Sequence, residues 1–157
     1  MKIGLMADSH DHVARIREAV ALLMECGAEA LVHAGDVVAP FAAKAVAGFE
    51  GPVHAVYGNN DGERRGLSRI RSICEPPLVL DLGGRCIVVA HDAADVPAEL
   101  AATADAVVTG HTHEPEIRPG RPLWLNPGET GGWLTGRATC AVLDLATMEA
   151  EICEIAG

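Results

Sequence analysis

Seven side chains that can bind divalent cations stand out in this chain of 157 residues. They are two carboxylates, one carboxamide and four imidazoles, and this donor set without sulfur suits Mn²⁺, Fe²⁺, Ni²⁺ or Zn²⁺ better than Mg²⁺ alone. Seven donors are too many for one tetrahedral zinc ion, but they suit two divalent ions about 3.5–4 Å apart that share a bridging carboxylate. The candidate ligands are Asp8, His10, Asp36, Asn59, His91, His111 and His113.

Each of these candidates follows an apolar run that is typical of a buried strand. The carboxyl ends of the strands in an open α/β sheet lie along one edge, which is where ligands bind. We therefore expect the five loops that carry the candidates to converge on one site. The strands before them are predicted at residues 2–7, 30–33, 53–57, 85–90 and 106–109.

Helices are expected between the first strands, which predicts right-handed crossovers and parallel pairing. The first is predicted to begin at residue 13 and end near Gly27, and the others at 41–47 and between residues 63 and 73, with a short helix later near 97–102. After Pro76-Pro77 the pattern changes, because strands at 78–82 and 85–90 are joined by Gly83-Gly84, which suits a tight antiparallel hairpin. Further strands are predicted at 123–125, 139–145 and 149–155. The pattern indicates an α/β fold with mixed sheets in a single domain, residues 1–157.

Taken singly, most candidates also have a structural explanation. Asp11 directly precedes the first helical pattern and is predicted to cap that helix, which leaves Asp8 as the functional residue. The Asn59-Asn60 pair could form a turn, and a single histidine such as His91 is more often structural than a ligand. His111 and His113 are harder to dismiss, because residues two apart project to the same side of an extended segment.

Composition excludes several classes of function. With 12 Lys+Arg against 22 Asp+Glu the formal charge is −10, and aromatic residues are only 3% of the chain, so extended nucleic acid is an unfavourable ligand. Five widely spaced cysteines without a Cys-x-x-Cys pair favour a reducing compartment, and we expect the protein to be cytoplasmic. No apolar stretch approaches the length that spans a membrane.

The order of the motifs resembles the signature of the calcineurin-like metallophosphoesterases. The matching segments are Asp8-x-His10, Gly35-Asp36, Gly58-Asn59-x-Asp61, His91 and Gly110-His111-x-His113. The small size and the Asn126-Pro127-Gly128 segment are similar to the compact bacterial and archaeal phosphodiesterases related to the retromer subunit Vps29. The resemblance implies a four-layer α-β-β-α sandwich with two mixed sheets and a dimetal site at the C-terminal ends of the strands.

The same resemblance implies a role for each ligand. Asp8, His10 and His113 would hold one ion, and Asn59, His91 and His111 would hold the other. Asp36 would bridge the two ions. A hydroxide between the ions would attack phosphorus, so no protein nucleophile is needed.

Asn60 departs from the family pattern, because larger relatives carry a histidine there. Asn60 cannot act as a general acid, although it can donate a hydrogen bond to a phosphoryl oxygen, so we expect diesters to be better substrates than alkyl monoesters. Asp61 loses its usual partner and is predicted to cap the next helix, while Glu129 stands where a small hydroxyl residue is more usual. Of the other histidines, His12 is a weak candidate for substrate contact, and His33 is expected in the core or behind the ligands.

These observations predict a dimetal phosphodiesterase that acts on small phosphate esters, with manganese as the favoured metal. Asp36, Asn59, Asn60 and His91 would take part in catalysis. The alternative is a non-catalytic scaffold like Vps29, but a scaffold would be free to lose ligands and all seven positions are filled. A homo-oligomer is possible, and no membrane partner is expected.

Overall fold

The computed structural model describes residues 1–46, 48–67 and 72–156, and the strands among them form two sheets. The six-stranded sheet has the order β11-β10-β1-β2-β3-β4, made of β1 (Lys2–Met6), β2 (Ala30–His33), β3 (Val53–Val56), β4 (Ser72–Cys74), β10 (Thr139–Asp144) and β11 (Glu149–Glu154). The five-stranded sheet has the order β5-β6-β7-β9-β8, made of β5 (Leu78–Leu82), β6 (Arg85–Val89), β7 (Ala106–Val108), β8 (Pro115–Arg118) and β9 (Leu123–Pro127). The helices are α1 (Val13–Glu25), α2 (Pro40–Val46), α3 (Arg64–Leu67), α4 (Ala98–Thr103) and a 3-10 turn, η1 (Ala93–Asp95).

Both sheets combine parallel and antiparallel pairs. β1 to β4 run parallel, as do β6, β7 and β9, whereas β10 joins β1 and β8 joins β9 in antiparallel register. The prediction of an α/β fold with two mixed sheets is therefore confirmed.

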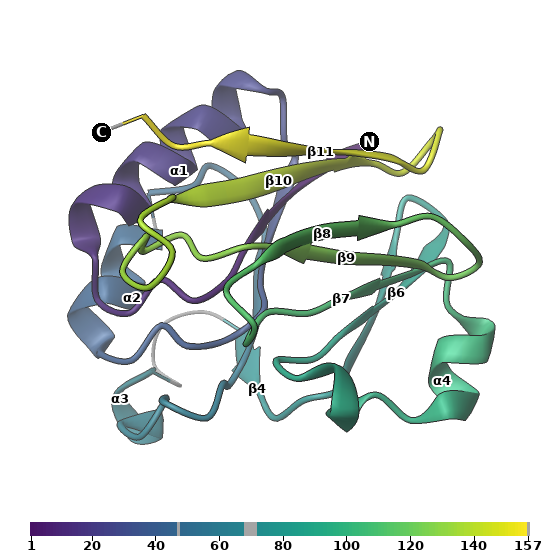
Figure 1. Cartoon of the computed structure of the whole chain (residues 1–157), viewed down its shortest axis with the longest axis horizontal. Helices are drawn as coiled ribbons and strands as arrows, with labels where there is room; N and C mark the ends of the chain where they lie inside the picture. The colour runs from purple at the N-terminus through teal and green to yellow at the C-terminus, as the bar shows by residue number, and fades with distance from the viewer. Residues whose placement is uncertain (47, 68–71, 157) are drawn as a thin grey trace.

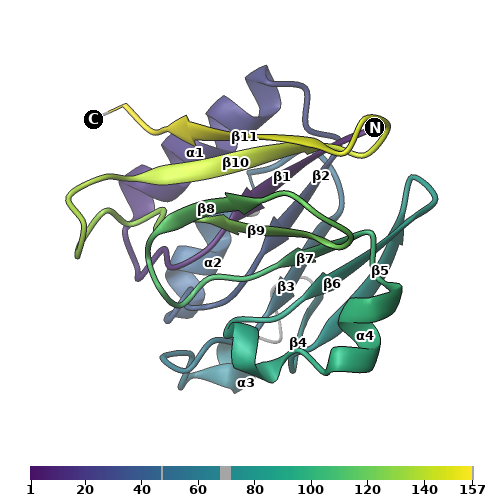
Figure 2. The ribbon, with the colours of Figure 1, turned by 45° about the vertical axis from the view of Figure 1, so that its right-hand side comes forward.

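The sheets pack face to face, with helices on both outer faces (Figures 1 and 2). Alternation along β1 sends Ile3 and Leu5 into the core between the sheets. Gly4 faces α1, and a Cβ there would lie 2.9 Å from a methyl carbon of Leu23, so glycine permits the close approach of the helix. Val107 of β7 packs beneath α4 on the opposite outer face. The result is the expected four-layer α-β-β-α arrangement.

The predicted hairpin at Gly83-Gly84 is present, since Leu82 pairs with Arg85 and both glycines have positive φ angles of 57° and 74°. Other boundaries need correction. Of the helix expected between residues 63 and 73, the described residues show Arg64–Leu67 as helix and Ser72–Cys74 as a strand beside β3. Residues 68–71 of that prediction, and residue 47 of the helix predicted at 41–47, lie outside the described residues. The strand β8 was not predicted.

No helix in the described part of the chain combines the length and apolar character needed to cross a membrane; α1, the longest, has 13 residues.

Candidate metal centre

The loops that follow five strands meet at one edge of the sandwich. The six-stranded sheet contributes the loops after β1, β2 and β3, and the five-stranded sheet contributes those after β6 and β7. A hydrogen bond from the His111 amide to Oδ2 of Asp8, 3.0 Å long, joins loops that are 103 residues apart in the sequence. All seven candidate ligands lie at this edge, where the strand order predicted they would meet.

A first group of donors consists of Asp8, His10 and His113, each with one donor atom within 4.8 Å of the others. Nε2 of His10 lies 3.8 Å from Oδ1 of Asp8, and Nε2 of His113 lies 3.6 Å from the same oxygen. The two imidazole rings are stacked with centroids 5.2 Å apart. These three residues can hold one divalent ion.

A second group consists of Asp8, Asp36 and His91, and all three are buried. Nε2 of His91 lies 3.4 Å from Oδ2 of Asp36 and 4.0 Å from Oδ1 of Asp8. Because Asp36 Oδ2 is also 3.5 Å from Nε2 of His10, the two carboxylates lie between the two groups of imidazoles. Asp8 is as central as Asp36, the residue expected to bridge.

Asn59 and His111 extend the second group. The carboxamide oxygen of Asn59 lies 2.9 Å from Nε2 of His91 and 3.1 Å from Nδ1 of His111. Nε2 of His111 lies 3.6 Å from the carboxylate of Asp92, a neighbour that was not predicted. The structure thus brings together all seven residues, while the division of ligands between two ions stays a prediction.

Two buried atoms at this centre lack a hydrogen-bond partner among the described residues, namely Oδ1 of Asp8 and Nε2 of His10. A buried polar atom left without a partner costs about 1–3 kcal/mol, and more if it is charged. Divalent cations would satisfy both atoms at once, and oxygen and imidazole donors are the ligands such ions take. The donor set therefore fits divalent metal ions.

The backbone of the centre is also strained. Non-glycine residues seldom have positive φ angles, and each costs of order 1–3 kcal/mol. Five of the seven candidate ligands have them: Asp8, His10, Asp36, His111 and His113, with φ between 39° and 69°. Such strain accumulates where a fold must hold side chains in one functional geometry.

Charges at the centre shift the pKa values of its members. Burial disfavours ionisation of Asp36, yet contacts from His91 and Asn60 lower its pKa below the usual range. Burial likewise favours a neutral His91, but Asp36, the carbonyl of Ala34 and Asp8 raise its pKa to about 9. The contact with Asp8 raises the pKa of His10. The negative charge of Asp8 and Asp36 accounts for the raised pKa values of His10 and His91, and it also favours the binding of cations.

Asp61 has a role different from the predicted helix cap. Its buried carboxylate accepts hydrogen bonds from the amides of Asp36, Val38 and Gly58 at 3.0, 2.6 and 2.7 Å. It ties the loop of Asp36 to the loop of Asn59, so it positions ligands instead of ending a helix. The hydrogen bonds from Asp36 and Val38 span 25 and 23 residues and leave no local sequence signal, whereas the one from Gly58 spans only three.

Asp11 also differs from its prediction. Its carboxylate accepts a hydrogen bond from the amide of Ala39 at 2.8 Å, and the residue before α1 is His12, whose ring accepts from the Arg15 amide at 3.5 Å. The helix is therefore capped by His12, while Asp11, which has a positive φ of 61°, binds the loop after β2. The ring of His12 packs on Trp133 with centroids 4.6 Å apart, and its contact with substrate stays a prediction.

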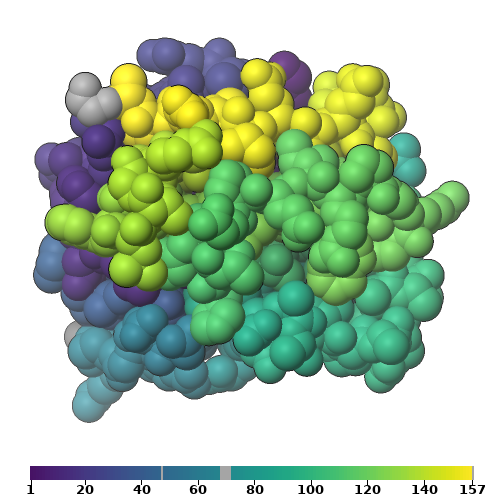
Figure 3. All heavy atoms as spheres, viewed as in Figure 1, coloured from purple at the N-terminus to yellow at the C-terminus, as the bar shows by residue number. Residues whose placement is uncertain are grey.

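Glu129, which the sequence left without a role, is fully buried beside His113. Its carboxylate lies 2.9 Å from Nδ1 of His113 and accepts from the amides of Trp133, Leu134 and Thr135. Although burial opposes ionisation, these bonds lower its pKa to about 2. The loop so anchored forms the yellow-green surface at the left of Figure 3.

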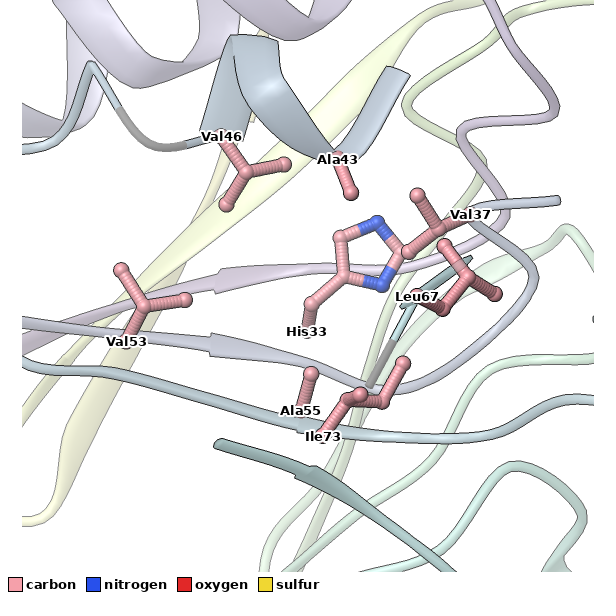
Figure 4. Close-up of a pocket in the computed structure, with 8 residues that line it drawn as sticks. All are labelled: His33, Val37, Ala43, Val46, Val53, Ala55, Leu67 and Ile73. Carbon is pink, nitrogen blue, oxygen red and sulfur yellow. The ribbon is translucent and has the colours of Figure 1, made fainter. Parts of the chain in front are cut away.

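His33 lies behind the centre, 1% exposed, and lines a small apolar cavity under α2 (Figure 4). Nδ1 accepts from the Gly35 amide at 3.3 Å, and Nε2 lies 3.1 Å from the hydroxyl of Ser9. His33 belongs to the core and also connects two of the loops that carry candidate ligands. Both predictions for this residue, a place in the core and a place behind the ligands, therefore describe it. Burial lowers its pKa to about 4.

Comparison with known proteins places these features in context. The model of the calcineurin-like phosphoesterase superfamily domain matches residues 1–148. Phosphodiesterase MJ0936 of Methanocaldococcus jannaschii is 34% identical over 159 residues, covering 95% of this chain and 96% of the relative.

Solved structures agree with this match. A structure described as a novel archaeal phosphodiesterase has a TM-score of 0.90 and 32% identity, covering 98% of this chain and 99% of its own. Vps29 of Chaetomium thermophilum has a TM-score of 0.71 at 14% identity, covering 98% and 95% of the two chains, which shows a shared fold alone.

Proposed function

The chain belongs to the calcineurin-like phosphoesterase superfamily, and from this premise we propose that it is a metal-dependent phosphodiesterase acting on small phosphate diesters. The observation that carries the proposal is the convergence of seven oxygen and imidazole donors. Two of their atoms, Asp8 Oδ1 and His10 Nε2, are buried and have no hydrogen-bond partner among the described residues. Its archaeal relatives named as phosphodiesterases support the choice of diesters.

In the proposed enzyme two divalent ions would be held by the seven ligands, Asp8, His10 and His113 holding one and Asn59, His91 and His111 the other. Asp36 would serve both. Ions bound there supply a nucleophile by lowering the pKa of water and polarise the phosphoryl oxygen. The mixed donor set favours manganese, with iron, nickel or zinc as alternatives.

The protein orients the imidazoles through their outer nitrogens. Nδ1 of His113 donates to Glu129, and Nδ1 of His91 donates to the carbonyl of Ala34 at 2.8 Å. A hydrogen bond at one ring nitrogen selects the tautomer in which the other nitrogen has a free lone pair. Metal binding would therefore use Nε2 of each ring, the atom that lies near the carboxylates of Asp8 and Asp36.

Asn60 stands beside the reacting position. Its amide and side-chain nitrogens donate to the two carboxylate oxygens of Asp36 at 2.8 and 2.7 Å. A carboxamide can turn to donate a hydrogen bond to phosphate but has no proton to give a leaving group. This supports a preference for diesters with good leaving groups over alkyl monoesters.

Metal content measured together with paired assays tests the proposal. Purified protein should contain two divalent ions per chain and hydrolyse bis(p-nitrophenyl) phosphate faster than p-nitrophenyl phosphate. His91→Ala should lose diester turnover, whereas His54→Ala, a histidine of β3 outside the cluster, should retain it.

The rival function makes the opposite prediction. A protein without bound metal and without turnover after addition of Mn²⁺ would be a non-catalytic scaffold with the fold of Vps29.

For the location of the protein we propose the cytoplasm, since all five cysteines are free thiols.

A further inference from the structure

A hollow of about 280 Å³ opens beside the candidate metal centre. Asn59, His91 and His111 form one side of it, so it adjoins the place where the phosphate would bind. Its volume suits a small organic group. The rest of the lining lies outside the seven candidate ligands and includes Tyr57, Arg64, Glu75, Pro76, Asp92 and Asp95.

The single guanidinium of this lining is already engaged. Arg64, the first residue of α3, forms an ion pair with Glu75, and its Nε donates to the carbonyl of Asp61 at 3.3 Å. Its guanidinium carbon lies 4.8 Å from the centre of the Tyr57 ring. Three contacts therefore hold the Arg64 side chain in place at the edge of the hollow, and the carboxylate of Glu75 neutralises its charge.

Two further carboxylates, Asp92 and Asp95, form no ion pair with a lysine or arginine among the described residues. Oδ1 of Asp92 accepts from the amide of Ala94 at 2.9 Å, which fixes the side chain at the start of η1 with its other oxygen near His111. Asp95, at the end of η1, is exposed at the rim. Among the described residues that line the hollow, one guanidinium stands against the three carboxylates of Glu75, Asp92 and Asp95, which gives them a net formal charge of −2.

We infer that this hollow receives the organic arm of the substrate and selects an arm that carries a positive charge, so that alkylammonium phosphodiesters are preferred. The inference rests on the proposed function. A zwitterionic diester matches the site at both ends, because its phosphate faces the cation-binding cluster while its ammonium group faces carboxylates. An arm with a second phosphate would be repelled.

The expected size of the preference follows from Coulomb's law. A unit charge about 7 Å from a carboxylate, in surroundings with an effective dielectric constant of about 40–80, changes an equilibrium by roughly three- to seven-fold. Two uncompensated carboxylates should therefore favour the cationic arm by at least about five-fold.

Two esters of the same shape and leaving group isolate this effect. p-Nitrophenyl phosphorylcholine and 3,3-dimethylbutyl p-nitrophenyl phosphate differ in having nitrogen or carbon at the centre of the terminal group. The ratio of their kcat/KM values should exceed about five in the metal-loaded enzyme and should shrink in 0.5 M NaCl, because salt screens exposed charges.

Substitutions locate the preference. Asp95→Asn and Glu75→Gln should each lower the ratio by roughly three-fold, and any general loss of activity cancels in the ratio. Asp81→Asn is the matched control, since Asp81 pairs with Cys86 at the other end of β6 from His91. It should leave the ratio unchanged.

The outcomes separate the two proposals. Turnover of both esters at a ratio near or below one, or a ratio that Asp95→Asn and Glu75→Gln do not lower, overturns the preference for a cationic arm and leaves the phosphodiesterase standing. Failure of both esters and of bis(p-nitrophenyl) phosphate to react overturns the phosphodiesterase, and the preference with it.

Discussion

Nδ1 of His113 lies 2.9 Å from the carboxylate of Glu129, and Nε2 of the same ring lies 3.6 Å from Oδ1 of Asp8. The ring thus connects the buried carboxylate of Glu129, which is not a candidate ligand, with that of Asp8, which is one. Glu129 also anchors the amides of Trp133 and Thr135, and the indole nitrogen of Trp133 donates to the carbonyl of His10 at 3.1 Å. One carboxylate therefore positions His113 directly and His10 through a loop.

We predict that Glu129→Gln weakens metal binding by about 10- to 100-fold, the usual effect of losing the residue that orients a ligand. The amide can no longer accept every hydrogen bond that the carboxylate does. Titration with Mn²⁺ measures the change, and excess Mn²⁺ should restore much of the activity. Glu114→Gln, an exposed change next to His113, is the control; equal affinities for the two variants would contradict the role of Glu129.

Asp61→Asn should destabilise the metal-free protein by about 2–4 kcal/mol, because an NH₂ group would replace an oxygen that accepts backbone amides and leave buried donors unpaired. Urea unfolding measures this loss. Diester turnover should fall as well, since the loops of Asp36 and Asn59 lose their common anchor. A variant as stable as Asp81→Asn, a change at an exposed position of β5, would show that the three hydrogen bonds contribute little.

Asn60→His should raise turnover of alkyl monoesters relative to diesters by at least about ten-fold, because an imidazole can protonate a poor leaving group. The measurement is the ratio of kcat/KM for the two classes in the same metal-loaded preparation. Asn60 is exposed, so the fold should tolerate the change. An unchanged ratio would mean that this position does not set the preference for diesters.

His33 should make folding sensitive to acid. Burial lowers its pKa to about 4 from the ordinary 6.5, so between these values the unfolded chain binds more protons than the folded one. The stability that the neutral ring contributes is present above pH 6.5 and falls as the pH drops towards 4, by about 2 kcal/mol at pH 5.

The variant His33→Gln isolates this effect, since glutamine can keep the bonds to Ser9 and the Gly35 amide without titrating. Urea unfolding at pH 7 and pH 5 should show a smaller loss of stability for the variant than for the unmodified protein. Parallel losses would place the acid sensitivity elsewhere.

Local patterns were sufficient to predict a mixed α/β fold and to list the donors, whereas the four-layer arrangement followed from the family resemblance. The apolar run that became β1 and the Gly83-Gly84 turn reflect forces between near neighbours, so they could be read from the sequence. The position of Asp8, Asp36 and Asn59 directly after parallel strands was enough to predict that they meet, because parallel strands end at a common edge.

Long-range packing decided the rest. Edge strand β8 and the short β4 are defined by pairing with β9 and β3, so their own residues carry little signal. Asp11 looked like a cap, but its side chain bonds to Ala39 across the next crossover.

The supports of the ligands were likewise settled only in three dimensions. Glu129 meets His113 over 16 residues and Asp61 meets Asp36 over 25, distances at which no local periodicity links two residues. The type of a side chain shows that it can bind a metal. The hydrogen bonds that orient it come from the loops that the fold places beside it. The sequence therefore indicated which residues could do the chemistry, and tertiary structure decided what holds them in place.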